Sequence, residues 1–419
     1  MTEQYKLNYI LVGLVVMGII TFLYLLVFLH AFKPEMLLNS FFWMGELGAL
    51  LLYANFFLKN KSLQINCVIL FLSLIVLFAF HFFYNATFWT YAVLMPFLLL
   101  LGCIHFTLYI VYISKNKAHA INNFCLFVSL PLFIMMSNYL LRLNGQTHPM
   151  VMDEFLMAMD GTLGIYPSLI VGRFIQHLSP VFSDILNLTY MSLPLAFILV
   201  YIKRESFDTK HHRNLVVEIL LIGIVGFMLY NIIPGCGSLY AFNNTWPVGL
   251  PDLFLQEGPQ LIYCPAIYPR NCLPSLHMAW LICLLRYVWL CDPITKVLML
   301  VLALGNVIAM FGVGAHYLTD LIVGFAFANF IGGLSSFQLP LKNAARRQAV
   351  LIGGSICIAW YVMIIYGIPL LQTSKILAWF IFLSSIFVSV RLEWNLFKEY
   401  SRAISNDRMS SEVEVLASN

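Results

Sequence analysis

Two histidines stand among other polar residues at points where long apolar segments begin. His316 and Asp320 are four residues apart, so a helix would place them on the same face. A carboxylate in that position can accept the Nδ1 hydrogen of the imidazole, which leaves Nε2 free as a nucleophile. The partial positive charge of a helix N-terminus also disfavours the imidazolium form. This spacing predicts covalent catalysis by His316, with Asp320 as its orienting group.

The other histidine, His277, ends a stretch that begins at Arg270. Within it, Pro274 suits the first turn of a helix, and Ser275 with nearby backbone N–H groups predicts a site for phosphate oxygens. Arg270 can pair with phosphate through two hydrogen bonds, and its neighbour Asn271 is assigned to the same phosphate site. His277 can protonate a leaving oxygen. The stretch therefore predicts phosphate binding beside a general acid.

Each stretch taken alone also has a less specific interpretation. A histidine and an aspartate four residues apart are usually a structural pair, and a lone Pro-Ser-x-His segment is no more specific. A metal site is a further alternative, because two histidines and one aspartate can bind zinc. The neighbouring Ser275 and Arg270 favour an oxyanion as the ligand, so neither a metal nor another cofactor is predicted.

The composition indicates the solvent in which these residues work. The chain has 419 residues, of which 61% are hydrophobic and 10% are charged, whereas soluble domains contain about 25% charged residues. The net charge of +4 is spread over dispersed basic residues, which excludes a nucleic-acid-binding protein. An aromatic content of 15% excludes a disordered chain. The sequence therefore predicts a polytopic membrane protein.

The apolar segments predict that this protein is all-α. They are continuous and long enough for membrane helices of about 20 residues, whereas barrel strands alternate over about 10 residues. We expect roughly twelve transmembrane helices, near residues 9–32, 40–58, 63–84, 88–113, 121–141, 181–202, 214–233, 273–290, 295–313, 316–337, 349–371 and 375–393.

Basic residues are concentrated in alternate connections between these segments, and such connections usually lie in the cytoplasm. They are Lys59, Lys61, Lys115, Lys117, Lys203, Arg204, Lys210, Arg213, Lys296, Lys342, Arg346 and Arg347, with Lys398, Arg402 and Arg408 in the tail. The long connection at 235–272 contains one basic residue, Arg270. We therefore expect both termini in the cytoplasm and both histidine stretches at the opposite face, towards the periplasm, the lumen or the exterior.

Two further features belong to the same outer face. Cys236, Cys264 and Cys272 lie in or beside the long connection. An oxidising compartment permits one disulfide there, which we expect between Cys236 and Cys264. Residues 146–178 mix acidic with apolar side chains, which predicts an amphipathic helix in the outer interface. That helix would be either a structural cover or a lid that faces the substrate.

The two histidine stretches together resemble the motifs of the type 2 phosphatidic acid phosphatase superfamily. The matching residues are Pro274-Ser275-Leu276-His277 and His316-Tyr317-x-x-Asp320. The similarity is to the inositol phosphorylceramide synthase (inositolphosphotransferase) branch, whose His-Tyr-x-x-Asp motif the sphingomyelin synthases also resemble. Residues 233–242 are similar to the degenerate first motif of that branch. The resemblance covers residues from about 121 to about 337.

The resemblance implies a six-helix lipid phosphatase/phosphotransferase core. It implies that His316 forms a phosphohistidine, that Asp320 orients it, and that His277 is the acid for the leaving group and the base for the acceptor. The expected domains are a four-helix extension at 1–118, the catalytic core at 119–340, a two-helix extension at 341–397 and a polar, disordered cytoplasmic tail at 398–419.

The sequence departs from the superfamily in its cationic residues. Ala309 and Met310 stand where the phosphatases carry a Ser-Arg pair, Leu276 replaces a glycine, and no intact Lys-and-Arg first motif is present. A site with few cations suits a phosphodiester with one negative charge better than a phosphomonoester dianion. We therefore expect a phosphotransferase that moves a phospho-headgroup, such as inositol phosphate, from a phospholipid donor to a lipid or glycan alcohol.

Two other functions remain open. The same core could act as a phosphatase on phosphatidate, an isoprenyl pyrophosphate or a sphingoid phosphate, with water as the acceptor. A transporter or scaffold without catalysis is the third hypothesis, although histidines near one membrane face, rather than at the midplane, argue against it. No nucleic-acid partner is expected, and the sequence leaves the oligomeric state open.

Overall fold

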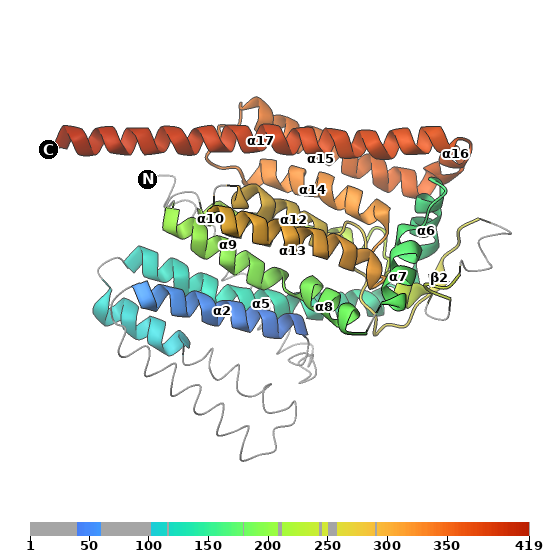
Figure 1. Cartoon of the computed structure of the whole chain (residues 1–419), viewed down its shortest axis with the longest axis horizontal. Helices are drawn as coiled ribbons and strands as arrows, with labels where there is room; N and C mark the ends of the chain where they lie inside the picture. Colours follow the sequence, from blue (N-terminus) through green and yellow to red (C-terminus); the bar gives the residue numbers. More distant parts are fainter. Residues whose placement is uncertain are drawn as a thin grey trace, which may run out of the picture. The chain divides into compact units, whose positions relative to one another are not determined.

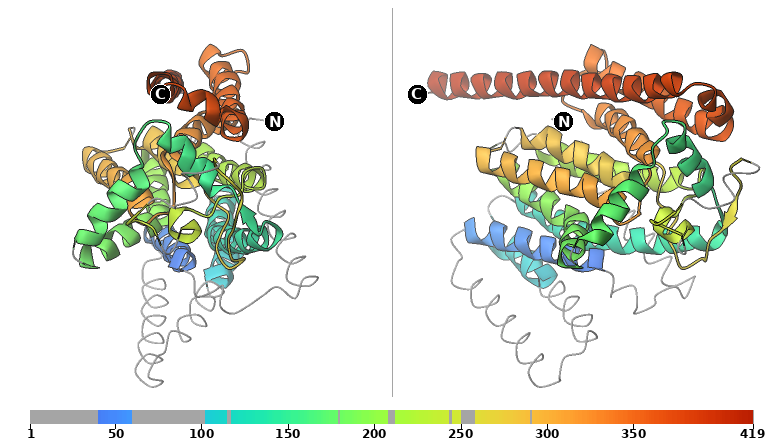
Figure 2. Two further views of the ribbon diagram at one scale, coloured as in Figure 1. Left: turned by 90° about the vertical axis from the view of Figure 1, so that its right-hand side faces the viewer. Right: turned by 45° about the vertical axis from the view of Figure 1, so that its right-hand side comes forward.

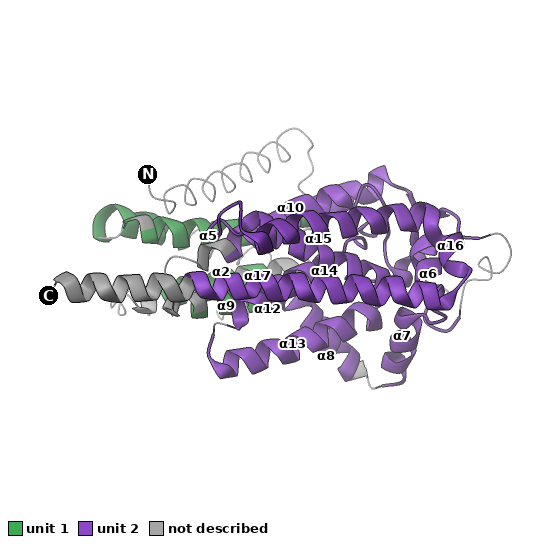
Figure 3. Cartoon of the chain, turned by 90° about the horizontal axis from the view of Figure 1, so that it is seen from above, with its two compact units in different colours: residues 1–139, 194–206 green, residues 140–193, 207–419 purple. Residues whose placement is uncertain are grey.

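The structure, a computed structural model, is mostly helical and describes residues 40–59, 102–114, 117–178, 180–207, 212–242, 245–249, 258–289 and 291–418 (Figure 1). The predicted spans at 9–32 and 63–84 lie outside the described residues, as does the first part of the span at 88–113. The chain divides into two compact units (Figure 3). Unit 1 comprises residues 1–139 and 194–206, and unit 2 comprises residues 140–193 and 207–419.

Unit 1 has an aromatic core. Its described elements are α2 (Ser40–Lys59), the helix Gly102–Ile113 with its final π-helical turn η2 (Tyr109–Ile113), most of α5 (Lys117–Thr147) and most of α9 (Leu193–Phe207). Phe57 and Phe106 are fully buried, and their ring centroids are 4.9 Å apart. The Tyr53 hydroxyl forms a hydrogen bond with Nδ1 of His105. Edge and tilted ring contacts therefore pack the described helices of this unit.

Unit 2 contains all the residues predicted from the sequence to be catalytic or to bind phosphate. Its elements are β1 (Met150–Val151), α6 (Asp153–Gly161), α7 (Pro167–His177), α8 (Pro180–Met191), α10 (His212–Leu229), α11 (Ser238–Ala241), β2 (Ile262–Tyr263), α12 (Leu276–Val288), α13 (Pro293–Gly312), α14 (Leu318–Ser335), α15 (Ala344–Val362), η4 (Met363–Gly367), α16 (Ile368–Gln372) and α17 (Lys375–Ser418). The two short strands pair antiparallel, with Met150 opposite Tyr263.

Helix α14 is the central element of unit 2. It packs against α10, α12, α15 and α17, and α6 lies across its N-terminal end (Figures 1 and 2). Small residues permit this close packing. At Gly324, for example, an added Cβ would lie only 2.5 Å from the carbonyl oxygen of Ser275, just before α12. The sequence of α14 therefore brings the start of α12 against the start of α14.

The long apolar helices indicate a multi-pass membrane protein. Five described helices are long and apolar enough to span a membrane: His119–Thr147, Pro293–Gly312, Leu318–Ser335, Ala344–Gln372 and Lys375–Ala403. The bent pair Val181–Met191 and Leu193–Lys203 would make a sixth. Four other predicted spans contain shorter apolar helices in the structure: Leu47–Phe57, Gly102–Ile113, Leu215–Leu229 and Leu276–Val288. The described residues thus contain helices that fit membrane spans in length and composition, but they confirm neither the count of twelve nor a six-helix core.

The C-terminal region differs from its predicted description. Residues 341–397, expected as a two-helix extension of the core, lie in unit 2, where α15 and α17 pack on α14. The polar segment 398–419, expected to be disordered, continues α17 as a helix to Ser418. Polarity alone suggested a disordered tail, but extending an existing helix needs no new nucleus and adds one backbone hydrogen bond per residue.

Candidate active site

His316 lies directly before α14, at the point where the chain turns into the helix. Its backbone N–H donates to the carbonyl of Met310 over 3.1 Å, and Tyr317 is the N-cap residue of α14. The carboxylate of Asp320 accepts the Tyr317 N–H over 2.9 Å. Its Oδ2 lies 3.4 Å from Nδ1 of His316, and both side chains are buried. The carboxylate therefore caps the helix and faces the imidazole with one oxygen.

Ser275 connects the second motif to His316. Its hydroxyl lies 3.4 Å from Nε2 of His316 and accepts the N–H of Met278 over 3.3 Å. The Ser275 N–H donates to the backbone carbonyl of Asp320 over 3.1 Å. Ser275 is thus the N-cap of α12, which begins at Leu276. Pro274 lies before the helix rather than in its first turn as predicted, because the Ser275 side chain provides the cap.

His277 lies in the first turn of α12 and is also buried. Its ring centroid is 6.0 Å from that of His316. The ring of Tyr190, from α8, stacks on His277 with centroids 3.9 Å apart and an interplanar angle of 17°. Tyr190 was not singled out from the sequence, since no motif surrounds it and its contact depends on the packing of distant helices. The stacking restrains the plane of the imidazole.

The turn at residues 233–242 supports the chain just before His316. Gly237 has φ = +92°, and an added Cβ would lie 2.7 Å from the carbonyl oxygens of both Gly314 and Ala315. The N–H of Leu239 donates to the Gly314 carbonyl over 3.0 Å. Only glycine fits this conformation and this close approach. The segment resembling a degenerate first motif therefore packs against the histidine loop.

Two carboxylates of α6 bind the start of α14 from the side. Asp153 accepts the hydroxyl of Tyr317 over 2.9 Å and the N–H of Gly237 over 2.8 Å. Asp160 accepts the N–H of Leu318 over 2.8 Å and both the N–H and the hydroxyl of Thr319 over 3.0 and 2.8 Å. Seven residues separate these aspartates, so they share one helix face. The carboxylates satisfy donors that a helix N-terminus otherwise leaves unpaired.

The position of these aspartates corrects the prediction of an amphipathic interfacial helix. The segment forms two helices, α6 and α7, and Asp153, Glu154 and Asp160 are all buried. Glu154 accepts the N–H of Gln260 over 2.8 Å. Burial raises the pKa of Asp153 to about 6 and that of Asp160 to about 7, and it outweighs the hydrogen bonds that favour the ionised forms. The acidic residues bind backbone groups inside the protein rather than water.

Arg270 is fully buried, and backbone carbonyls surround its guanidinium. Nε donates to His148 over 2.9 Å, Nη1 to Tyr268 over 2.7 Å and Nη2 to Cys264 over 2.7 Å. Further carbonyls of Pro265 and Gly145 lie within 3.2 and 3.4 Å. This network organises the loop before α12. A phosphate contact by Arg270 would have to replace some of these bonds, so that role stays a prediction.

Asn271, the other predicted phosphate ligand from this loop, is half-buried. The structure brings together Ser275, His277, His316 and Asp320 but shows no hydrogen bond, within the described part of the chain, from the Asn271 side chain to these residues. Its role also stays a prediction.

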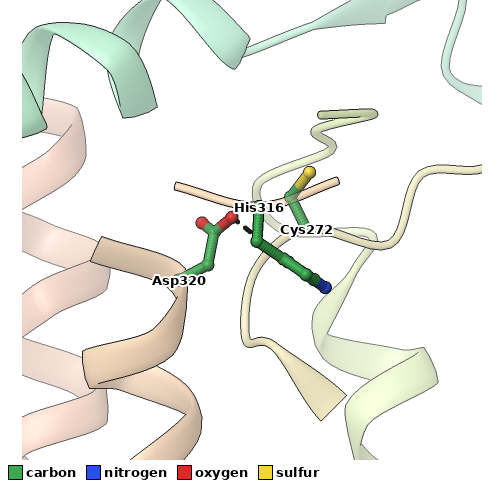
Figure 4. Close-up of side chains that lie close together, drawn as sticks. All are labelled: Cys272, His316 and Asp320. Carbon is green, nitrogen blue, oxygen red and sulfur yellow. Dashed lines mark ion pairs between the residues drawn. The ribbon is translucent and has the colours of Figure 1, made fainter. Parts of the chain in front are cut away.

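Three cysteines lie close to these residues. The sulfurs of Cys236 and Cys264 are 3.0 Å apart, and the predicted disulfide between them stays a prediction because the structure has both as free thiols. Cys272 approaches His316 and Asp320 (Figure 4), and one ligand atom from each of the three lies within 4.8 Å of the others. These residue types can bind zinc. The Cys272 thiol also lies 3.4 Å from the carbonyl of Ala315, to which it donates.

The wall of the site is low in positive charge. Met310, which the sequence resemblance sets against an arginine of the phosphatases, is fully buried, and its sulfur lies 3.7 Å from the Ser275 hydroxyl. Among the described residues, no lysine or arginine hydrogen-bonds to Ser275, His316 or Asp320. The arrangement thus brings together an imidazole nitrogen, a hydroxyl and a second imidazole, with few cations beside them.

Comparison with known families gives one match, and it covers the candidate site. Residues 154–334 match the family model described as the PAP2 superfamily. That match runs from α6 to α14 and includes His277, His316 and Asp320. Neither the curated proteins nor the solved structures gave a match.

Proposed function

We propose that this protein is an integral-membrane phosphotransferase that moves a phospho-headgroup from a phospholipid to a lipid or glycan alcohol through a phosphohistidine. The match of residues 154–334 to the PAP2 superfamily supports phosphatase or phosphotransferase chemistry on lipid phosphoesters. One observation supports the more specific proposal of a phosphohistidine. His316 is held between Asp320 at Nδ1 and Ser275 at Nε2, with His277 beside it.

In the first step, Nε2 of His316 attacks the phosphorus of the donor. A nitrogen–phosphorus bond forms, and the bond from phosphorus to the diacylglycerol oxygen breaks. His277 gives a proton to that oxygen, so diacylglycerol leaves as a neutral alcohol. Asp320 stabilises the positive charge that develops on the His316 ring. The Ser275 hydroxyl donates to a phosphoryl oxygen.

In the second step, the hydroxyl of the acceptor attacks the same phosphorus. His277, now neutral, accepts the hydroxyl proton, and the nitrogen–phosphorus bond breaks with its electron pair returning to Nε2. The headgroup is then attached to the acceptor, and both histidines regain their starting forms. The ring centroids of His277 and His316 are 6.0 Å apart, which suits two groups acting on opposite sides of one phosphoryl group.

The scarcity of cations favours transfer over hydrolysis of a monoester. A phosphomonoester dianion needs more fixed positive charge than a phosphodiester monoanion. Met310 offers a thioether where an arginine would supply that charge. A lipid phosphatase is the second candidate because it uses the same groups with water as the acceptor.

We also propose that the reaction needs no metal. Cys272, His316 and Asp320 could hold a zinc ion, but such binding would occupy the nitrogen or carboxylate that the phosphohistidine path uses. The nearby Ser275 hydroxyl is not a preferred zinc ligand and suits a phosphate oxygen instead.

The test is an assay of the purified protein in lipid nanodiscs with EDTA present throughout. Phosphodiester donors with labelled headgroups, phosphatidylinositol among them, are compared with labelled phosphatidate. We expect headgroup transfer to an added lipid alcohol with release of diacylglycerol. His277→Ala should lower kcat by about 10²–10⁴-fold, and His316→Ala should abolish turnover. His177→Ala, which changes an exposed histidine, serves as the control and should leave turnover intact.

Three outcomes would contradict the proposal. Release of inorganic phosphate from phosphatidate as the main activity would identify a phosphatase. Loss of activity in EDTA with recovery in zinc would identify a metal site. Full turnover by His316→Ala would exclude the phosphohistidine.

A further inference from the structure

A cavity of about 590 Å³ lies in unit 2 between the second half of α12 and the middle of α17. Both helices pack on α14, and Phe325 of α14 lines the cavity between them. Apolar side chains such as Ile282 and Phe387 make up much of the remaining lining. The cavity therefore has a mainly apolar lining.

The cavity is separate from the candidate active site. Along α12, nine residues separate His277 from Arg286 in the cavity wall, which corresponds to about 13 Å. Helix α17 begins at the active-site end, where the Trp379 indole donates to the carbonyl of Leu163 in the α6–α7 connection over 3.2 Å. Nineteen residues later, Lys398 lies about 29 Å further along the helix. This distance equals the thickness of the hydrocarbon layer, about 30 Å.

The end of the cavity farther from the candidate active site, called its rim here, carries residues typical of a membrane interface. Trp289 and Trp394 line it and are about half exposed, and tryptophans favour the headgroup level. Arg391 and Lys398 are exposed and seven residues apart, so they share a face of α17. Neither forms an ion pair within the described part of the chain, and the Lys398 ammonium lies 5.1 Å from the Trp394 ring.

The third cation of the cavity wall is already neutralised. Arg286 is buried and donates to both carboxylate oxygens of Glu393 over 2.6 and 2.5 Å. It also pairs with the buried Glu218. The positive charge available to a ligand therefore comes from Arg391 and Lys398 at the rim.

We propose that this cavity binds an anionic phospholipid from the leaflet opposite the candidate active site. One acyl chain lies along Ile282, Phe325 and Phe387, and the phosphate lies between Arg391 and Lys398. The apolar lining fits the acyl chain of a lipid, which a free phosphate lacks. The two cations favour an anionic headgroup over a neutral one. The site needs only that the helices span a membrane, so it does not depend on the phosphotransferase reaction.

The test is native mass spectrometry of the purified full chain in detergent, titrated with phosphatidylserine and separately with phosphatidylcholine. We expect one phosphatidylserine to bind more tightly than phosphatidylcholine. The double variant R391A/K398A should weaken phosphatidylserine binding about 30-fold, because each cation at a membrane surface contributes about 1 kcal/mol and 1.4 kcal/mol is tenfold.

Two further variants make the result specific to the cavity. The matched control K342A/R347A removes two exposed cations outside the cavity lining, one from the α14–α15 connection and one from the first turn of α15, and should retain phosphatidylserine. Val390→Trp adds bulk to the cavity wall without changing charge and should also weaken binding. Equal affinity for the two lipids, unchanged binding by R391A/K398A, equal weakening by K342A/R347A, or full binding by Val390→Trp would each overturn the proposal.

Discussion

At the scale of single residues, the local spacing of the two motifs accounts for the centre of the site. The spacing of His316 and Asp320 predicted one helix face; His316 instead lies before the N-cap residue of α14, yet the carboxylate is 3.4 Å from the imidazole. Ser275 caps the helix that carries His277, which fixes both groups at one helix end. Capping and helical spacing act over three or four residues, so a sequence reveals them directly.

The charge of Asp320 should contribute to the rate without being indispensable. Asp320→Asn keeps an oxygen near Nδ1 but removes the negative charge that stabilises the phosphorylated ring. We expect kcat to fall about 10²-fold, less than in His316→Ala, with KM little changed. Asp184→Asn, at an exposed aspartate of α8, is the control for steady-state kinetics. A change confined to KM would show that Asp320 acts in binding rather than in orienting His316.

Other residues of the site could not be recognised from local patterns. Tyr190 reaches His277 through the packing of α8 on the rest of unit 2, and nothing in its neighbours indicates that contact. Arg270 shows the opposite case. Its residue type suits phosphate, yet the fold surrounds its guanidinium with backbone carbonyls of a loop. The stacking of Tyr190 on His277 and the bond from Arg270 to His148 both join segments distant in sequence.

At the scale of elements, α6 holds the start of α14. Asp153 and Asp160 together bind four groups within residues 317–319, counting the Tyr317 hydroxyl and the hydroxyl of Thr319. These bonds orient the turn that carries His316. The acidic residues of this segment predicted a charged face towards water, because composition does not reveal which donors a buried carboxylate will meet.

The raised pKa of Asp160 predicts a pH-dependent stability. Since its folded pKa is about 7 and that of the unfolded chain is near 3.8, the folded state holds a proton that the unfolded state releases between these values. Stability therefore falls as pH rises through this window, by at most about 1.4 kcal/mol per pH unit. Asp160→Asn should reduce the fall in thermal unfolding midpoint between pH 5 and pH 7.

The comparison for this measurement is Asp184→Asn, which should show the same pH dependence as the wild type. Asp153 has a raised pKa of about 6, so it should also lower the thermal unfolding midpoint as pH rises, by a smaller amount. That smaller decrease should remain in Asp160→Asn. An unchanged slope in Asp160→Asn would mean that Asp160 is ionised in the folded protein.

At the scale of the whole molecule, hydropathy predicted a membrane protein but not where its helices begin and end. Five described helices are long enough to span it, six with the bent pair, whereas α10 and α12 are apolar but short. Hydropathy measures apolar length and not where a helix is capped, so Ser275 begins α12 later than the apolar run suggested. Helices α15 and α17 pack on α14, and contacts of this kind have no signature in a single sequence.

The predicted orientation places the β2 loop and the α14–α15 connection on opposite sides of the membrane. Ile267 and Leu341 are both exposed and represent the two regions. In sealed vesicles, an impermeant maleimide should label Ile267→Cys and Leu341→Cys from opposite sides. Unsubstituted protein gives the background, and its described cysteines are buried or half-buried. Labelling of both variants from the same side would contradict the topology.

The central claim, a covalent phosphohistidine at His316, is tested most directly by isolating that intermediate. The protein is mixed with the phospholipid donor that supports turnover, without acceptor, and its peptides are analysed by tandem mass spectrometry under conditions that preserve acid-labile phosphoramidates. We predict a phospho-headgroup on His316 that disappears when the acceptor alcohol is added and is absent from His316→Ala. An active wild-type protein with no adduct on His316, or with the adduct on another residue, would contradict the account.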